Sequence, residues 1–84
     1  MTEATVKLFA SLSDYLPAGA KNNAVTVSLT ERATIGSALA QLQVPKERCH
    51  LVLLNGVFVS PSARSACEIK DGDTIAVWPP VAGG

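Results

Sequence analysis

The sequence predicts an α+β roll, in which a mixed sheet of four to five strands packs on one main helix. Several short segments alternate apolar and polar residues, one stretch has helical spacing, and Asn55-Gly56 is a strong turn signal. A single helix covers only one face of a sheet, so a two-layer arrangement is expected. The 84 residues suffice for one domain with a modest core.

Two strands are predicted in the first part of the chain. Residues 5–10 alternate, with Val6 and Leu8 on one face and Phe9 on the other. Residues 25–29 alternate in the same way. The connection between them contains Pro, Gly and an Asn-Asn pair, which predicts a loop and therefore a wide hairpin.

One amphipathic helix of about ten residues follows. Thr34 is its expected N-cap, because a Thr oxygen accepts a hydrogen bond from the first helical turn. Pro45 is expected to end the helix by forcing Val44 out of helical geometry. Apolar residues with i, i+3, i+4, i+7 spacing define its buried face: Ile35, Ala38, Leu39 and Leu42.

A tight hairpin is predicted after the helix. Residues 51–54 and 57–59 flank Asn55-Gly56, and both turn residues tolerate positive φ. The following stretch, residues 60–68, contains a Pro and several small residues and is expected to be irregular.

The last predicted strand, residues 74–78, follows a tight Asp-Gly-Asp turn. We expect it to lie parallel to the first strand at the centre of the sheet, joined through the helix by a right-handed crossover. This is the architecture of the ubiquitin-like β-grasp. Pro79-Pro80 then stops the strand, so residues 1–78 are expected to form the domain and residues 79–84 a flexible C-terminal arm.

Composition excludes several functional classes. The formal charge is zero and the Lys and Arg residues are scattered singly, which argues against nucleic-acid binding. No signal segment or membrane-spanning stretch is evident, so a cytoplasmic location is expected. In a reducing compartment Cys49 and Cys67 stay thiols, and we expect them to act as buried or half-buried small hydrophobes.

Catalytic, metal and nucleotide motifs are not evident. Cys49-His50 lacks the third group of a nucleophile system and the spacing of a zinc site. The carboxylates are scattered, and Asp71 and Asp73 fit ordinary turn chemistry. Without a phosphate-binding loop the chain is not expected to hold ATP. We therefore expect no metal site and no cofactor.

Three aromatic residues are candidates for a partner-binding surface: Phe9, Phe58 and Trp78. Phe9 and Trp78 are predicted on the sheet face opposite the helix, where a one-helix roll leaves the sheet open. Exposed aromatics there would form a docking patch. The equally weighted alternative is that residues 11–23 or 60–68 fold over them.

The segment that follows the last strand ends in Gly83-Gly84. A frayed end is one interpretation. The other is that the terminal carboxylate reacts, since a Gly pair without Cβ atoms can thread a narrow tunnel in a partner enzyme. Pro79-Pro80 would hold such an arm away from the domain.

The sequence resembles the small subunit of molybdopterin synthase, a ubiquitin-like sulfur carrier. The resemblance spans nearly the whole chain: the opening VKLFASL, the TIGSALAQL helix, the LNG turn, and above all GDTIAVWPPVAGG. It implies that an E1-like enzyme, which supplies ATP and Mg²⁺, adenylates Gly84. A sulfur nucleophile would then displace AMP to leave a thiocarboxylate at Gly84, which would insert into the large subunit and donate sulfur to cyclic pyranopterin monophosphate to build the dithiolene of molybdopterin.

The same resemblance implies roles for individual residues. Gly84 is the sulfur-bearing position, and Gly83 is its neighbour in the tunnel. The inserting arm comprises Pro79, Pro80, Val81 and Ala82. The chain would then be a stoichiometric donor, with catalysis mainly in the large subunit. The Pro- and Gly-containing loop at 16–20 departs from a minimal carrier.

Three alternatives remain at the level of sequence. Carriers for thiamine, cysteine or tRNA thiolation share the fold and the Gly-Gly end, although fewer of them have Pro-Pro-Val before it. A ubiquitin-like modifier would use the same adenylated terminus to form isopeptide bonds. A plain β-grasp interaction domain would need no terminal chemistry.

Overall fold

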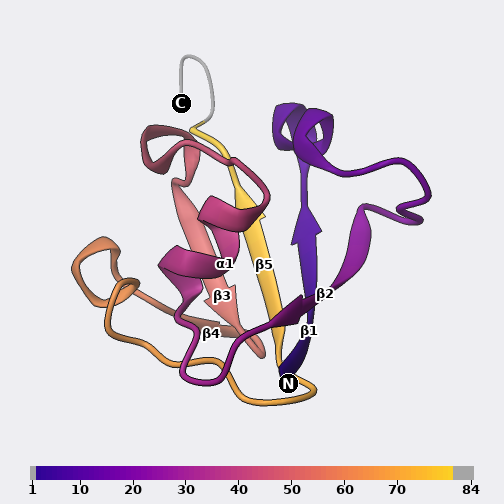
Figure 1. The fold of residues 1–84 in the computed structure, drawn as a ribbon. Helices are drawn as coiled ribbons and strands as arrows, with labels where there is room; N and C mark the ends of the chain where they lie inside the picture. Colours follow the sequence, from indigo (N-terminus) through magenta and orange to yellow (C-terminus); the bar gives the residue numbers. More distant parts are fainter. Residues whose placement is uncertain (1, 81–84) are drawn as a thin grey trace.

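A five-stranded sheet in the order β2-β1-β5-β3-β4 is the framework of the protein in a computed structural model, which describes residues 2–80 (Figure 1). The strands are β1 (Thr2–Leu8), β2 (Ala24–Leu29), β3 (Leu51–Leu54), β4 (Val57–Phe58) and β5 (Thr74–Trp78). One α-helix, α1 (Ile35–Gln41), and three 3₁₀ turns complete the described elements: η1 (Ala10–Tyr15), η2 (Lys46–Arg48) and η3 (Pro61–Ala63).

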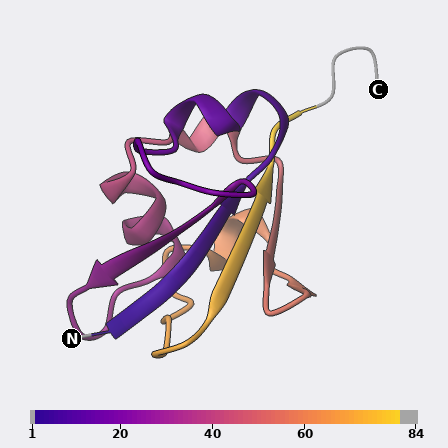
Figure 2. The ribbon, with the colours of Figure 1, turned by 90° about the vertical axis from the view of Figure 1, so that its right-hand side faces the viewer.

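The first and last strands lie side by side at the centre. β1 pairs parallel with β5, placing Val6 beside Ile75, and every other pairing in the sheet is antiparallel. After β2 the chain forms α1, then β3 and β4, and only then β5, and α1 covers one side of the central strands (Figure 2). The predicted β-grasp roll is confirmed.

The core lies between α1 and one face of the sheet. Strand residues alternate between buried and partly exposed, as the period of a half-buried strand requires. The largest fully buried side chains come from β1, η1, β2, α1, β3 and β5: Val6, Leu8, Leu12, Leu29, Ile35, Val52, Ile75 and Val77. The alternation in the sequence therefore indicated the buried face correctly.

The helix begins where predicted. Thr34 Oγ1 accepts a hydrogen bond from the backbone N–H of Ser37 at 3.1 Å, and the Thr34 N–H donates to Ser37 Oγ at 2.8 Å. This reciprocal pair is a capping box with Ser in place of the usual Glu or Gln.

The helix is shorter than the predicted ten or so residues, and Pro45 is not what ends it. Gln43 adopts a left-handed conformation (φ 63°), and its N–H donates to the carbonyl of Ala40 at 2.9 Å. The Val44 N–H donates to the carbonyl of Leu39 at 3.0 Å. This is a Schellman motif, which satisfies the last helical carbonyls before the proline is reached.

Both predicted tight turns are present. Asn55 and Gly56 have φ of 51° and 84°, the positive values that a two-residue hairpin of this type needs. Gly72 has φ of 89° in the turn before β5, where the Asp73 N–H donates to the Lys70 carbonyl at 3.0 Å. Across residues 2–80, none of the helices has the length and apolarity to cross a bilayer.

Candidate functional site

The sheet face opposite α1 carries the predicted aromatic residues. Along β5, Ile75 and Val77 are buried, while the alternating residues Ala76 and Trp78 are only partly buried. The register places Leu51 opposite Trp78. In the next row, Leu53 pairs with both Ala76 and Phe58. We call Phe9, Leu51, Leu53, Phe58 and Trp78 the aromatic patch.

Phe9 and Trp78 are brought into direct contact. Their ring centroids are 4.6 Å apart and their planes differ by 10°, so the rings are stacked. The Phe9 N–H donates to the Val77 carbonyl at 3.1 Å, which continues the central β1–β5 pairing beyond the end of β1. Both aromatic side chains are half-buried, in part against each other.

Phe58 lies on the same face but apart from that stack, because it pairs with Leu53 and not with Leu51, the partner of Trp78. Its side chain is 56% exposed, one of two large hydrophobic residues exposed to this degree in the described part of the chain. The exposed Phe58 beside partly buried leucines makes this face a candidate surface for binding another protein.

Residues 60–68 do not cover the patch. Backbone N–H groups at the start of α1 donate to this segment, from Ile35 to Cys67 O (3.1 Å) and from Gly36 to Arg64 O (3.0 Å). The segment therefore packs on the helix side of the sheet. Of the two alternatives for the aromatic residues, cover by 60–68 is wrong.

The chain leaves the sheet next to the patch. β5 ends at Trp78, whose carbonyl accepts a hydrogen bond from the His50 N–H at 2.9 Å. Pro79 is buried and Pro80 is exposed. Of the remaining predicted site residues, Val81, Ala82, Gly83 and Gly84 lie outside the described residues. The described start of the arm and the aromatic patch are thus contiguous.

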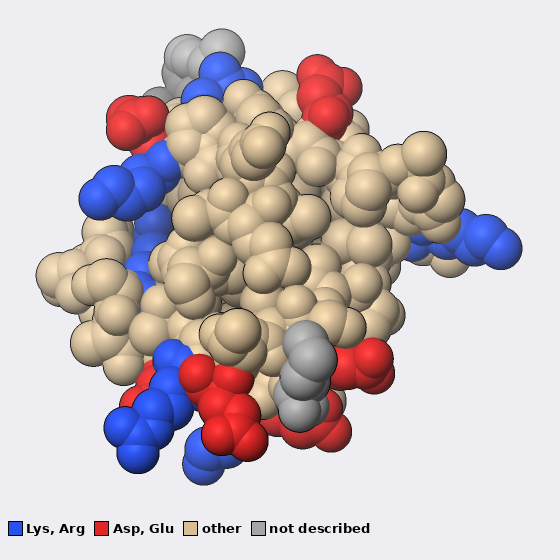
Figure 3. Space-filling view, viewed as in Figure 1, with Lys and Arg blue, Asp and Glu red and all other residues tan. Residues whose placement is uncertain are grey.

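Charged residues do not form a basic surface on the face seen in Figure 3. Lys and Arg are mixed with Asp and Glu at the margins, and the centre of this face is uncharged. Near the end of β5, Arg48 Nη2 donates to Ser11 Oγ at 2.7 Å, which ties η2 to η1. The face seen in Figure 3 therefore offers no continuous basic surface for a phosphate backbone.

Cys49 is a structural residue. Its thiol is buried, and Sγ lies 3.4 Å from the Pro45 carbonyl oxygen. Burial raises the pKa of the Cys49 thiol, an effect that Arg64 partly offsets. A protonated thiol is a poor nucleophile and metal ligand. Within residues 2–80, no three His, Cys, Asp or Glu side chains cluster closely enough to bind a metal.

Arg64 is a buried residue that the sequence did not indicate. It is 9% exposed, and its guanidinium donates from Nη1 to Cys49 O (2.6 Å) and from Nη2 to His50 O (3.0 Å). These bonds fasten segment 60–68 to the start of β3. In the sequence Arg64 is one of several isolated cations, so no pattern distinguished it.

Comparison with known proteins places the chain in a family. The model of the Mut7-C ubiquitin family matches residues 1–83. No curated protein sequence matches the chain significantly.

Solved structures similar to this chain include a small archaeal modifier protein and subunits of molybdopterin-converting factor. SAMP1 from Haloferax volcanii, a small archaeal modifier protein, is 27% identical over 98% of this chain and 99% of its own, with a TM-score of 0.69. A Pyrococcus furiosus protein assigned as molybdopterin converting factor subunit 1 is 25% identical over 96% of this chain and 100% of its own, with a TM-score of 0.70.

A third similar structure is a complex of subunits 1 and 2 of molybdopterin-converting factor from Helicobacter pylori. The matching chain is 21% identical over 99% of this chain and 100% of its own, with a TM-score of 0.61, and shows the shared fold. The chain belongs to the Mut7-C ubiquitin family, and it is a small ubiquitin-like β-grasp protein of the class that includes sulfur carriers and protein modifiers.

Proposed function

We propose that this protein is a sulfur carrier, the small subunit of molybdopterin synthase, and that Gly84 is the residue that carries the sulfur. The observation that supports this most is the contiguity of three features. The central strand β5 ends at Trp78 on the aromatic patch, and the next residues in the chain are the Pro-Pro-Val-Ala-Gly-Gly arm. A donor of this kind needs a binding surface and a narrow reactive arm next to each other.

The terminal chemistry needs activation. A carboxylate is a poor acyl donor, since it has no good leaving group at neutral pH. An E1-like enzyme with ATP and Mg²⁺ would convert the Gly84 carboxylate to an acyl-adenylate and release pyrophosphate. Sulfide would then attack the carbonyl carbon and AMP would leave. Attack by a protein persulfide would instead form an acyl disulfide, which a thiol cleaves by reduction to free the thiocarboxylate.

The arm would deliver that group into the large subunit. Pro79 and Pro80 favour an extended backbone, and Val81, Ala82 and Gly83 narrow toward the end. Residues 1–78 would then be the rigid domain and residues 79–84 the inserting arm. The carrier would hold no metal or cofactor of its own, and most catalytic groups would belong to the large subunit.

The aromatic patch would be the common docking surface for two partners, the large subunit and the E1-like enzyme. Aromatic side chains such as Phe and Trp are enriched in protein interfaces. Phe9 and Trp78 lie beside the exit of the arm, so docking there would bring the arm to the partner. The Helicobacter pylori complex of subunits 1 and 2 supports a two-subunit assembly.

A second function is favoured by a specific observation. The similarity to SAMP1 supports a ubiquitin-like modifier, in which a lysine amine of a target protein would displace AMP and form an isopeptide bond. The sulfur routes to thiamine, cysteine or thiolated tRNA remain candidates for the same carrier. The Pro-Pro-Val of the arm is the feature that favours molybdopterin.

Complementation tests the pathway. The chain is expressed in bacterial strains that lack either the small subunit of molybdopterin synthase or the thiamine sulfur carrier. We expect rescue of the molybdenum-dependent activity in the first strain. Rescue of thiamine-free growth alone would overturn the molybdopterin assignment, and isopeptide conjugates without rescue of either strain would favour the modifier.

Variants of the arm test the role of Gly84. Deleting Gly84, or adding one residue after it, is expected to abolish rescue while leaving the melting temperature nearly unchanged. The matched control is the exposed substitution Asp14→Asn, which should rescue as well as the unaltered chain. A large loss of stability on removing Gly84 would contradict a projecting arm. The intact mass of the purified protein checks that Gly84 is its last residue.

A further inference from the structure

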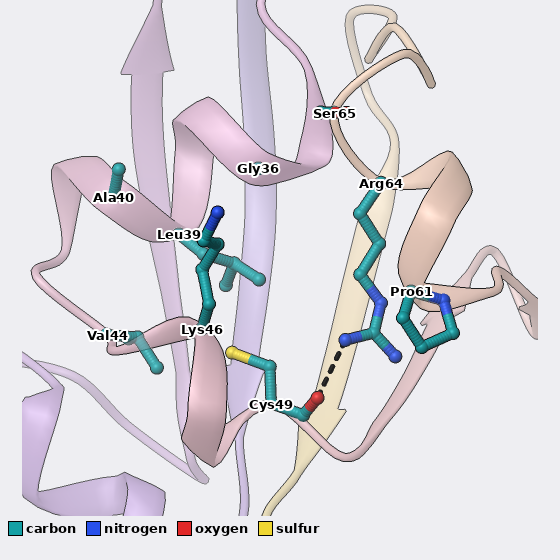
Figure 4. Close-up of a pocket in the computed structure, with 9 residues that line it drawn as sticks. All are labelled: Gly36, Leu39, Ala40, Val44, Lys46, Cys49, Pro61, Arg64 and Ser65. Carbon is teal, nitrogen blue, oxygen red and sulfur yellow. Dashed lines mark hydrogen bonds between the residues drawn. The ribbon is translucent and has the colours of Figure 1, made fainter.

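A pocket of about 510 Å³ lies between α1, η2 and the segment after η3, away from the aromatic patch. Figure 4 shows Leu39 and Lys46 along one side and Arg64 and Pro61 along the other, with Cys49 between them at the base. The full lining is Gly36, Leu39, Ala40, Val44, Lys46, Cys49, Pro61, Arg64 and Ser65. Its volume falls within the range of about 300–1,000 Å³ that small-molecule sites occupy.

The lining combines apolar side chains with side chains of positive charge only. Leu39, Ala40, Val44 and Pro61 supply apolar surface. Lys46 and Arg64 are both cationic, and no Asp or Glu belongs to the part of the wall that the structure describes. A ligand that fits both properties has an apolar body and a negative group.

The positive charge of Arg64 is unusual because the residue that carries it is nine-tenths buried. Its two hydrogen bonds go to the backbone carbonyls of Cys49 and His50, which are neutral dipoles and not carboxylates. A guanidinium carries five N–H donors. Its Nε is buried and has no acceptor among the residues that the structure describes. A buried cation without an anion is costly, and an incoming carboxylate would reduce that cost.

Lys46 is placed to assist at the mouth. It begins η2, its side chain is exposed, and Figure 4 shows that side chain extending along Leu39 toward α1. Lys46 at the rim and Arg64 in the wall are the two cationic side chains that line the pocket. Arginine binds a carboxylate through paired N–H donors, whereas lysine acts as a point charge.

We propose that this pocket binds a small molecule made of an apolar body and one carboxylate, with the carboxylate between Lys46 and Arg64. The pocket is lined by residues of α1 and so lies on the helix side of the sheet, whereas the aromatic patch lies on the opposite face. Such a ligand would therefore bind without blocking the patch. This proposal does not depend on the proposed function of the arm.

The test uses the whole chain and three defined probes. The chain labelled with ¹⁵N is titrated with 4-phenylbutyrate, with its neutral analogue 4-phenylbutanamide, and with inorganic phosphate, while amide shifts are followed. We expect 4-phenylbutyrate to shift the amides of Gly36, Ala40 and Ser65 in a saturable way. The neutral amide should bind at least tenfold more weakly, and phosphate should produce no saturation in the same range.

Two exposed lining positions give variants that should still fold. Lys46→Gln is expected to weaken 4-phenylbutyrate binding at least threefold, and Ala40→Phe to abolish saturation by filling the pocket. The matched control Lys70→Gln removes an exposed lysine outside the pocket and should leave the affinity unchanged. Arg64→Lys, which keeps the charge and loses the paired donors, should weaken binding if the variant remains folded.

Several results would overturn the proposal. Equal affinity for 4-phenylbutyrate and its amide would show that the charges play no part. Shifts centred on Phe58 and Trp78 would place the ligand on the aromatic patch instead. An absence of saturable binding would leave Arg64 as a purely structural residue that joins segment 60–68 to β3.

Discussion

The stacked rings of Phe9 and Trp78, with centroids 4.6 Å apart, join the ends of the two central strands on the sheet face opposite α1. Phe9 follows β1 directly, and Trp78 is the last residue of β5. The contact therefore lies where the chain leaves the sheet. It links the stability of that end of the sheet to the surface proposed for partner binding.

Replacing Phe9 and Trp78 by Ala, singly and together, should reveal this coupling. Stacked aromatic pairs contribute about 0.5–1.5 kcal/mol beyond the area that they bury. We expect the double variant to lose less stability than the sum of the single variants by that amount, as measured by urea unfolding. Strictly additive losses would mean that the stacking adds nothing to the fold.

The same face should govern partner binding. Phe58→Ala removes a side chain that is 56% exposed, so it should change the unfolding free energy little and weaken binding to the large subunit strongly. The matched control is Val57→Ala, whose side chain is 67% exposed and precedes Phe58 in β4. Equal effects of both variants on affinity, measured by calorimetry, would contradict a site centred on the aromatic patch.

Loss of the helix cap should destabilise the domain measurably. Thr34→Ala removes the oxygen that accepts a hydrogen bond from Ser37, and such substitutions cost about 1 kcal/mol. Thermal and urea unfolding measure this loss. Thr30→Ala, at an exposed position before the helix, is the control and should change stability by less than about 0.5 kcal/mol. A similar cost for both would mean that the cap contributes little.

Acid should weaken the turn before β5. The Lys70 N–H and the Asn55 side chain donate to the Asp73 carboxylate at 2.8 and 2.9 Å, and these bonds lower the pKa of Asp73. A carboxyl whose pKa is lowered by folding adds stability above its unfolded pKa of about 3.9, and that stability is lost as pH falls through the folded pKa.

Asp73→Asn should therefore flatten the dependence of stability on pH in this acidic range. The unaltered protein should lose stability progressively below about pH 4, whereas the variant should lose less over the same interval. Urea unfolding at several pH values measures both. An unchanged pH profile in the variant would show that Asp73 does not contribute to acid sensitivity.

The two thiols should react at different rates. Burial raises the pKa of Cys49, whereas Cys67 is only half-buried. Iodoacetamide at pH 8 should label Cys67 first and Cys49 slowly, with both labelled rapidly in urea. Peptide mass spectrometry follows each site. Fast labelling of Cys49 in the folded protein would contradict its buried position.

Most of the fold could be predicted because its signals are local. Alternation identified the buried faces of β1 and β5, and the Asn55-Gly56 pair identified the hairpin. The helix end was predicted less well. Gln43 takes the left-handed conformation that ends the helix, and this position is usually occupied by Gly or Asn, so the sequence contained no signal for it. Val44, whose N–H makes one of the Schellman hydrogen bonds, is also buried in the core, and that burial is set by tertiary packing.

The two candidate sites also differ in how far local sequence signals could predict them. The aromatic patch could be anticipated from side-chain alternation, although the sequence could not say whether a loop covered it. The pocket could not be anticipated, because Arg64 meets Cys49 and His50 only after segment 60–68 folds back on α1. Contacts between residues distant in sequence leave no periodic signal.

High-accuracy mass spectrometry of the intact chain and its C-terminal peptide tests the central claim most directly. The protein is incubated with an E1-like enzyme of its host, ATP, Mg²⁺ and a sulfur source. We predict exchange of one oxygen for sulfur at Gly84, located to the terminal peptide so that oxidation of Met1, of nearly equal mass, is excluded. An unchanged Gly84, with neither adenylate nor sulfur attached, would contradict the sulfur-carrier account.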